Sequence, residues 1–276
     1  MRPKAIGMLA FREIRAALRG RWFVVGAVAF AALAIAVSQL GMANAARWGI
    51  STMDRTTSAL LNLVLLFIPL LGIPLGAESL TGEEEDGTLG YLISQPLHRS
   101  EVFAGKLLGL CASLTLSITL GFGLAAIWIG WGGSVEGSLF WLLAGGAWLL
   151  GIFSVSLGLL IATLARNRMK ALAFSIAAWL TLVFLCDFGV LAITASQTLG
   201  SNALFAITVA NPLQAVKTLV SLFISQRLEV LGPAGIHAVQ TVGRPVMSLL
   251  LAGSIGLWMA AASSLAYYRF RREDLL

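Results

Sequence analysis

Residues 56–77 of this chain read TTSALLNLVLLFIPLLGIPLGA, a run that contains no Asp, Glu, Lys or Arg. An α-helix needs about 20 predominantly apolar residues to cross the ~30 Å hydrocarbon core of a bilayer. The run therefore predicts a transmembrane helix. Pro69 and Pro74 remove backbone donors within it and should bend the helix axis, either as a tolerated kink or as a hinge for gating.

Similar apolar runs recur on both sides of this stretch. The 276 residues are 58% hydrophobic and 12% charged, whereas a typical soluble domain carries about 25% charged residues. Such a chain cannot cover its surface with charge in water, so we expect lipid to be its solvent. The sequence predicts one all-α integral membrane domain over residues 1–276, with six transmembrane helices at about 22–42, 57–77, 107–130, 139–164, 171–195 and 246–268.

Basic residues flank these predicted spans unevenly. Arg166, Arg168 and Lys170 crowd the short connection between the fourth and fifth spans, and the residues after the sixth span, 269–272, read RFRR. Because cytoplasmic loops carry an excess of Lys and Arg, we expect both termini to be cytoplasmic. The net charge of +6 is distributed over these flanks and not gathered on a folded domain, which argues against a nucleic-acid partner.

Residues 4–19 form a stripe at helical spacing just ahead of the first span. At 100° per residue an apolar side separates from a basic side. Ile6, Leu9, Ala10, Ile14, Ala17 and Leu18 share the apolar side, and Lys4, Arg12, Arg15 and Arg19 share the basic side. We expect this amphipathic helix to lie in the inner membrane interface, where anionic lipid attracts Arg and Lys. It is either an anchor that fixes topology or, in addition, a contact for a cytoplasmic partner.

The connection between the second and third spans, residues 78–106, reads ESLTGEEEDGTLGYLISQPLHRSEVFAGK. An acidic run at 83–86 is followed by Gly87, a short apolar patch, Pro96 and Arg99. An acidic run alone is usually a solvated face. The apolar patch and the proline go beyond what a simple connection needs, so we expect this cytoplasmic segment to contact another protein.

The same segment resembles the cytoplasmic segment of ABC-2 type permeases, whose pattern runs acid, Gly, Thr, two or three leucines, Pro, Arg, acid, Gly, Lys. The matching residues are Gly82, Glu83, Gly87, Thr88, Leu89, Leu92, Pro96, Arg99, Glu101, Gly105 and Lys106. Within that family the chain is most similar to the NosY-type branch, named after the membrane subunit of the transporter for nitrous oxide reductase maturation. The run RTTSALLN at 55–62 adds to this similarity.

The resemblance implies a fold like that of type V ABC exporters, in the cytoplasmic membrane of a bacterium or archaeon. It implies a half-transporter that pairs with a second copy and with a separate ATPase subunit. The residues expected to couple to that ATPase are Glu78, Gly82, Glu83, Glu84, Glu85, Gly87, Leu89, Leu92, Pro96, Arg99, Glu101 and Lys106. Arg12, Arg15 and Arg19 are the site residues expected on the interfacial helix.

The chain itself lacks the pattern of a phosphate-binding loop, G-x-x-x-x-G-K-[ST]. Gly105 and Lys106 are followed by Leu107, and Ser100 stands where the first glycine would be. We therefore expect this chain to be no enzyme and to bind no cofactor directly. ATP and Mg²⁺ would bind to the partner ATPase subunit.

Residues 196–244 form a long outer segment between the fifth and sixth spans. Asn211 and Pro212 predict a helix start, with Asn as N-cap and Pro at the first helical position. The polar side chains of Gln214, Thr218, Ser221 and Ser225 then follow one narrow stripe. This pattern predicts an amphipathic helix at the outer interface or a re-entrant one. It is either a lipid-facing cap or a gate or platform for a periplasmic partner protein.

Asp187 is the acid within the predicted fifth span. An ionisable residue inside a membrane is by default a functional hypothesis. However, Asp187 lies ~24 Å along a helix that starts near Ala171, close to the outer boundary of the core. It is therefore either a solvated or capping residue or a contact for cargo or a gate.

Two other classes of protein remain open. An ion-coupled secondary carrier would use paired charges near mid-membrane, and a membrane anchor would only recruit partners. A membrane enzyme or metal site would need ligand spacing that the two histidines and two cysteines lack. Small lipophiles, lipids and peptides are all compatible with these residues as cargo. The NosY-type resemblance implies a sulfur or copper species for nitrous oxide reductase maturation.

Overall fold

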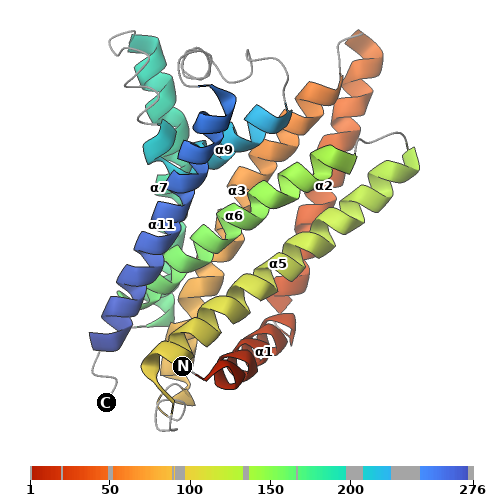
Figure 1. The fold of residues 1–276 in the computed structure, drawn as a ribbon. Helices are drawn as coiled ribbons and strands as arrows, with labels where there is room; N and C mark the ends of the chain where they lie inside the picture. The colour runs from red at the N-terminus through yellow and green to blue at the C-terminus, as the bar shows by residue number, and fades with distance from the viewer. Residues whose placement is uncertain are drawn as a thin grey trace.

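The structure, a computed structural model, describes residues 2–19, 21–48, 52–88, 90, 97–132, 137–165, 167–196, 208–224 and 243–272. All regular elements within these ranges are helices, in agreement with the predicted all-α class (Figure 1). They are α1 (Pro3–Arg19), α2 (Arg21–Trp48), α3 (Thr52–Glu85), α5 (Arg99–Gly132), α6 (Gly137–Ala162), α7 (Arg168–Ser196), α9 (Pro212–Ile224) and α11 (Arg244–Arg272).

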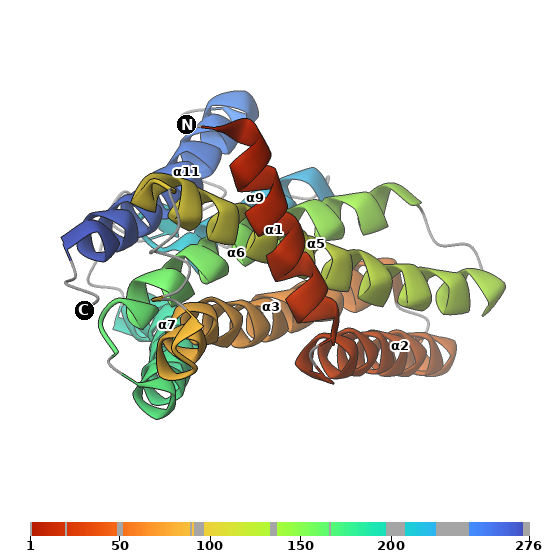
Figure 2. The same ribbon diagram turned by 90° about the horizontal axis from the view of Figure 1, so that it is seen from below.

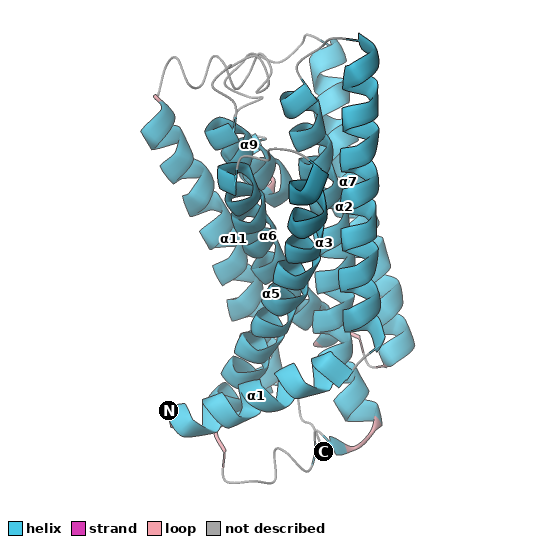
Figure 3. Ribbon diagram, turned by 90° about the vertical axis from the view of Figure 1, so that its right-hand side faces the viewer, coloured by secondary structure: helices cyan, strands magenta, loops and turns pink. Residues whose placement is uncertain are grey.

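Each of the predicted spans overlaps one of the long helices, α2, α3, α5, α6, α7 or α11. Among the described residues, four segments are long and apolar enough to cross a membrane: Thr57–Glu85, Arg99–Trp128, Phe140–Ala162 and Arg244–Arg272. A fifth candidate is α1 together with Val24–Gln39 of α2, a pair bent by 64°. The bend leaves α1 lying across the end of the bundle where α11 ends (Figure 3).

The most extensive contact between two helices joins α3 and α6, which pack closely because both have glycines at the contact. A Cβ atom added at Gly76 would lie 2.5 Å from the carbonyl oxygen of Val155 and 3.0 Å from the Cα of Gly158. Association in lipid depends on van der Waals packing, and small residues let two helix backbones approach. The paired glycines therefore determine where α3 and α6 touch.

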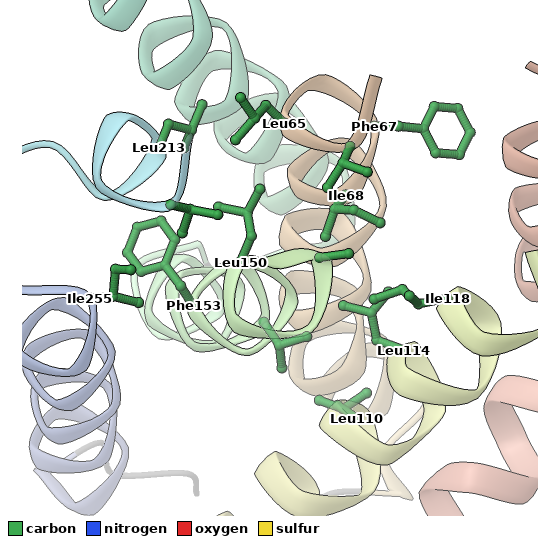
Figure 4. Close-up of a cluster of buried hydrophobic side chains, with 14 of the residues drawn as sticks. Leu65, Phe67, Ile68, Leu110, Leu114, Ile118, Leu150, Phe153, Leu213 and Ile255 are labelled. Atoms are coloured by element: carbon green, nitrogen blue, oxygen red, sulfur yellow. The ribbon is translucent and has the colours of Figure 1, made fainter. Parts of the chain in front are cut away.

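The apolar core is centred on α6, whose inward side chains meet residues from several helices (Figure 4). Leu150 and Phe153 of α6 are almost fully buried, as are Ile68 of α3 and Leu114 of α5. Leu213 of α9 and Ile255 of α11 complete the cluster on the other side of α6. Close packing of such side chains holds one bundle together.

Helix α9 starts where the sequence predicts, since Asn211 Oδ1 accepts hydrogen bonds from the backbone N–H groups of Leu213 at 3.0 Å and Gln214 at 3.5 Å. Whether it is interfacial or re-entrant stays a prediction. It packs between α6 and α11, and Val216 and Val220 are buried. Its described residues end at Ile224, whereas the sequence pattern extends to 228. Residues 225–228 lie outside the described part of the structure.

The connection between α3 and α5 is shorter than the sequence predicts, because residues 78–85 continue α3 and α5 already begins at Arg99. Glu is a good helix former, so an acidic run does not interrupt a helix. Gly87 ends α3 with a φ of 70°, a conformation that glycine adopts without strain. Its N–H donates to the carbonyl of Glu84 at 3.2 Å, as in a helix C-cap.

Candidate functional site

Lys106 lies two turns into α5 and is one of the most deeply buried charged residues described, with only 1% of its surface exposed. Its ammonium group donates hydrogen bonds to Glu13 Oε1 at 3.0 Å and to the carbonyl oxygen of Ser79 at 2.9 Å. Glu83 Oε2 lies 2.8 Å away as an ion pair, outside hydrogen-bond geometry. An ammonium has three N–H donors, so three oxygens surround the buried charge.

Arg12 completes this group of charges from the surface side. Its guanidinium pairs with Glu83 and lies 3.4 Å from Glu13 Oε1, while 43% of the side chain stays exposed. We refer to Arg12, Glu13, Glu83 and Lys106 as the Lys106 cluster. Two cations and two carboxylates balance its charge, which buried ionised groups require. The cluster joins α1, α3 and α5.

Two glycines on α5 allow α1 to reach this position. A Cβ atom added at Gly105 would lie 2.6 Å from the Cβ of Leu9, and one added at Gly109 would lie 2.5 Å from the Cβ of Glu13. Residues four apart lie on the same face of a helix, so Gly105 and Gly109 form one shallow track for α1. Figure 2 shows α1 crossing beneath α5. The close approach is what brings Glu13 within reach of Lys106.

Glu101 ties the beginning of α1 to the beginning of α5. Its Oε1 accepts a hydrogen bond from the backbone N–H of Arg2 at 2.6 Å, and its Oε2 accepts one from the backbone N–H of His98 at 3.2 Å. The contact to His98 is half of a capping box, in which a Glu at the third helical position reaches back to the N-cap. Glu101 is 1% exposed.

Arginines attach α7 and α11 to the same end of the bundle. Arg168 at the start of α7 donates its backbone N–H to Glu85 Oε1 at 2.8 Å, and its Nε to Glu78 Oε1 at 3.3 Å. Arg99 at the start of α5 donates to the carbonyl oxygen of Arg271, near the end of α11, at 2.8 Å. Polar contacts thus link α3 to α7, just before the α3–α5 connection, and α5 to α11, just after it.

The residues expected to couple to an ATPase therefore divide into two sets. Glu83, Glu101 and Lys106 point into the protein, where Lys106 and Glu101 are buried and Glu83 is mostly covered. Glu84 and Asp86 are exposed, Glu78 and Glu85 pair with Arg168, Arg99 contacts Arg271, and Gly82 and Gly87 lie at the end of α3. Leu89, Leu92 and Pro96 lie outside the described residues.

The remaining predicted site residues lie apart from the cluster. Arg15 and Arg19 are exposed on α1, and the Arg15 guanidinium lies 5.1 Å from the centre of the Phe11 ring. Asp187 belongs to α7, and its side chain is outside the described part of the structure. Among the described residues, no group of three or more His, Cys, Asp or Glu side chains could hold a metal ion.

Sequence reasoning missed Glu13, although a signal was present. Glu13 follows Leu9 by four residues, so an acid lies on the predicted apolar side of an otherwise basic helix. An ionisable side chain on the apolar side of an amphipathic helix requires a buried partner. In the structure that partner is Lys106, which lies 93 positions further along the chain.

These features define a multi-pass helical membrane protein with a charged, internally paired end. Residues 8–275 match the ABC-2 family transporter protein family, and the chain belongs to that family. It is 28% identical over 274 residues to the probable ABC transporter permease protein NosY of Pseudomonas aeruginosa, covering 97% of this chain and 98% of that protein. It is 29% identical over 190 residues to the corresponding protein of Stutzerimonas stutzeri, covering 67% of this chain and 69% of that protein.

The comparisons confirm the predicted resemblance to NosY-type ABC-2 permeases. The chain is thus a transmembrane permease of the ABC transporter class, and such permease subunits are generally non-catalytic.

Proposed function

We propose that this chain is the permease half of an ABC transporter in which two copies each engage a separate ATPase subunit. The chain would cross the cytoplasmic membrane of a bacterium or archaeon six times, with both termini inside. Family membership over nearly the whole chain carries the proposal. In support, α1, the end of α11, the end of α3 and the start of α5 all lie at one end of the bundle (Figures 1 and 3).

The ATPase subunit would bind at the α3–α5 connection. Glu84 and Asp86 leave their carboxylates exposed beside it, and Thr88 is exposed next to Gly87. Basic groups on a partner would complement this acidic rim. Glu83, which the sequence places in the same acidic run, is instead held by Lys106 and Arg12. Glu83 would hold the end of α3 in place and would not contact the partner itself. ATP with Mg²⁺ would bind on the partner alone.

The cargo would be a sulfur or copper species for nitrous oxide reductase maturation, as the NosY-type similarity suggests. A periplasmic partner protein would receive or deliver it near residues 196–244, and Asp187 would serve as a cargo or gate contact. The lipid bilayer would contact the basic face of α1, through Lys4, Arg15 and Arg19. These assignments rest on the family and on residue chemistry.

A photo-crosslinking amino acid placed at Thr88 tests the docking surface. We expect ultraviolet light to join this position to a P-loop ATPase subunit in intact cells, because the side chain lies beside the proposed contact. The matched control is Trp141 on α6, which is 80% exposed and should capture no ATPase. Capture from Trp141 and not from Thr88 would contradict the proposed docking site.

A further inference from the structure

The Lys106 cluster is placed where a movement of the α3–α5 connection would reach α1. Glu83 lies in the last turn of α3, immediately before the connection, and Lys106 lies two turns into α5, just after it. Arg12 and Glu13 belong to α1, which is separated from both in sequence. The cluster therefore lies between the segment that would meet an ATPase and the helix at the membrane surface.

Packing holds α1 mainly to α5, and no extensive contact between α1 and α3 occurs within the described residues. The Gly105 and Gly109 track receives Leu9 and the backbone of Ala10. Helix α1 makes its extensive contacts with α5 and a smaller contact with α2. The ion pairs that link α1 to α3 involve Glu83. Arg12 of α1 pairs with Glu83 directly. Glu13 of α1 is linked to Glu83 through Lys106, which pairs with both carboxylates.

Stability alone is a weak explanation for such a cluster. Replacing a buried ion pair or triad by apolar residues of similar volume is often neutral or stabilising, because burying charge costs desolvation energy. Charged groups differ from apolar ones because their contacts are directional: the Lys106 ammonium donates to Glu13 Oε1 and to the Ser79 carbonyl and forms an ion pair with Glu83, which fixes the positions of three helices relative to one another. Interlocked polar elements with few alternative arrangements are able to transmit motion.

We propose that the Lys106 cluster is an ionic clamp that makes α1 and the end of α3 move as one body, so that displacement of the α3–α5 connection is passed to α1. Its four residues are positioning residues, and they contact neither nucleotide nor cargo. The coupling role rests on the proposed pairing with an ATPase. The clamp itself is a property of this chain and can be measured without a partner.

The test uses a neutralised cluster, Glu13→Gln, Glu83→Gln and Lys106→Met combined, in full-length chain with Cys111 and Cys186 replaced by Ser. This combination leaves no unpaired buried charge, so the bundle should remain folded. Spin labels at Met8 on α1 and Asp86 after α3 report the distance across the clamp in lipid nanodiscs. Both side chains are exposed, so labels should not disturb the packing.

A second label pair and a second variant serve as controls. Labels at Met8 and Leu124 join α1 to an exposed position further along α5, so they follow the steric contact. Glu78→Gln removes a carboxylate from α3 that pairs with Arg168 and not with α1. Neither label pair should respond to Glu78→Gln.

We expect the neutralised cluster to broaden the Met8–Asp86 distance distribution about twofold while the Met8–Leu124 distribution stays unchanged, because loss of the ionic link frees α3 but not α5. Unchanged Met8–Asp86 distances, or equal broadening of both pairs, would overturn the clamp. In the assembled transporter, ATP should move the α1 label in the parent protein and not in the neutralised variant. Absence of any ATPase partner would defeat the proposed function and leave the nanodisc result standing.

Discussion

Replacing Lys106 by Met is expected to lower the free energy of unfolding by about 3–5 kcal/mol, because removing one partner of a buried ion pair leaves the other charge uncompensated. Here the carboxylates of Glu13 and Glu83, which lie 3.0 and 2.8 Å from the ammonium, lose their buried cation, and the half-exposed Arg12 alone remains beside the two negative charges. The backbone carbonyl of Ser79 loses its donor as well. Thermal unfolding in one detergent, followed by intrinsic tryptophan fluorescence, measures the effect.

Two comparisons make this result specific. Lys4→Met removes the same charge from an exposed position of α1 and should change stability by less than about 0.5 kcal/mol. Adding Glu13→Gln and Glu83→Gln to Lys106→Met should recover most of the loss, because the buried negative charge disappears. An unfolding temperature for Lys106→Met equal to that of Lys4→Met would show that the Lys106 charge is not compensated as described.

Gly158→Ala is expected to destabilise the bundle by about 1–3 kcal/mol or more, as overpacking does in a tightly packed interior. An added Cβ would lie 2.9 Å from the Cα of Gly76 and 3.0 Å from the backbone nitrogen of Ala77, and it would also collide with the carbonyl oxygen of Ile73. These are backbone atoms, which cannot rotate away as a side chain can. Helices α3 and α6 would have to separate along their longest contact.

Gly145→Ala is the matched control on the same helix. Nothing lies within 4 Å of a Cβ added at Gly145, so the change should be neutral or slightly stabilising, since Ala favours the helix more than Gly. Unfolding of both variants in increasing denaturing detergent gives the comparison. Equal effects of the two substitutions would contradict the close crossing of α3 and α6.

The long helices could be located from the sequence, because a chain that crosses a membrane needs long apolar runs. That there are six spans stays a prediction. Residues 56–77 lie in α3, for example, and Asn211 caps α9 as its chemistry predicts. The depth of α9 could not be predicted. A stripe that includes Ser221 is typical of an exposed side, yet Ser221 is buried. Its neighbour Val220 lies against Gly146 of α6.

The candidate site was predictable as a segment but not as a set of contacts. Glu83 reads as one acid among several in 83–86, and its separation from exposed Glu84 depends on which side of α3 meets α5. Lys106 reads as a basic flank of a span, whereas its burial depends on α1 being drawn over it by Gly105 and Gly109. Such long-range pairings leave no local periodicity in the sequence. The roles of Leu89, Leu92 and Pro96 stay predictions.

The most direct measurement is purification of the tagged chain from its native membrane in mild detergent, followed by mass spectrometry and an assay of ATP hydrolysis. The account predicts a P-loop ATPase subunit in a ratio of two to two with this chain, and hydrolysis that is absent when the permease is isolated from that subunit. A chain that purifies without any nucleotide-hydrolysing partner, at salt that preserves the bundle, would contradict the proposed ATP-driven permease and turn attention to an ion-coupled carrier or a membrane anchor.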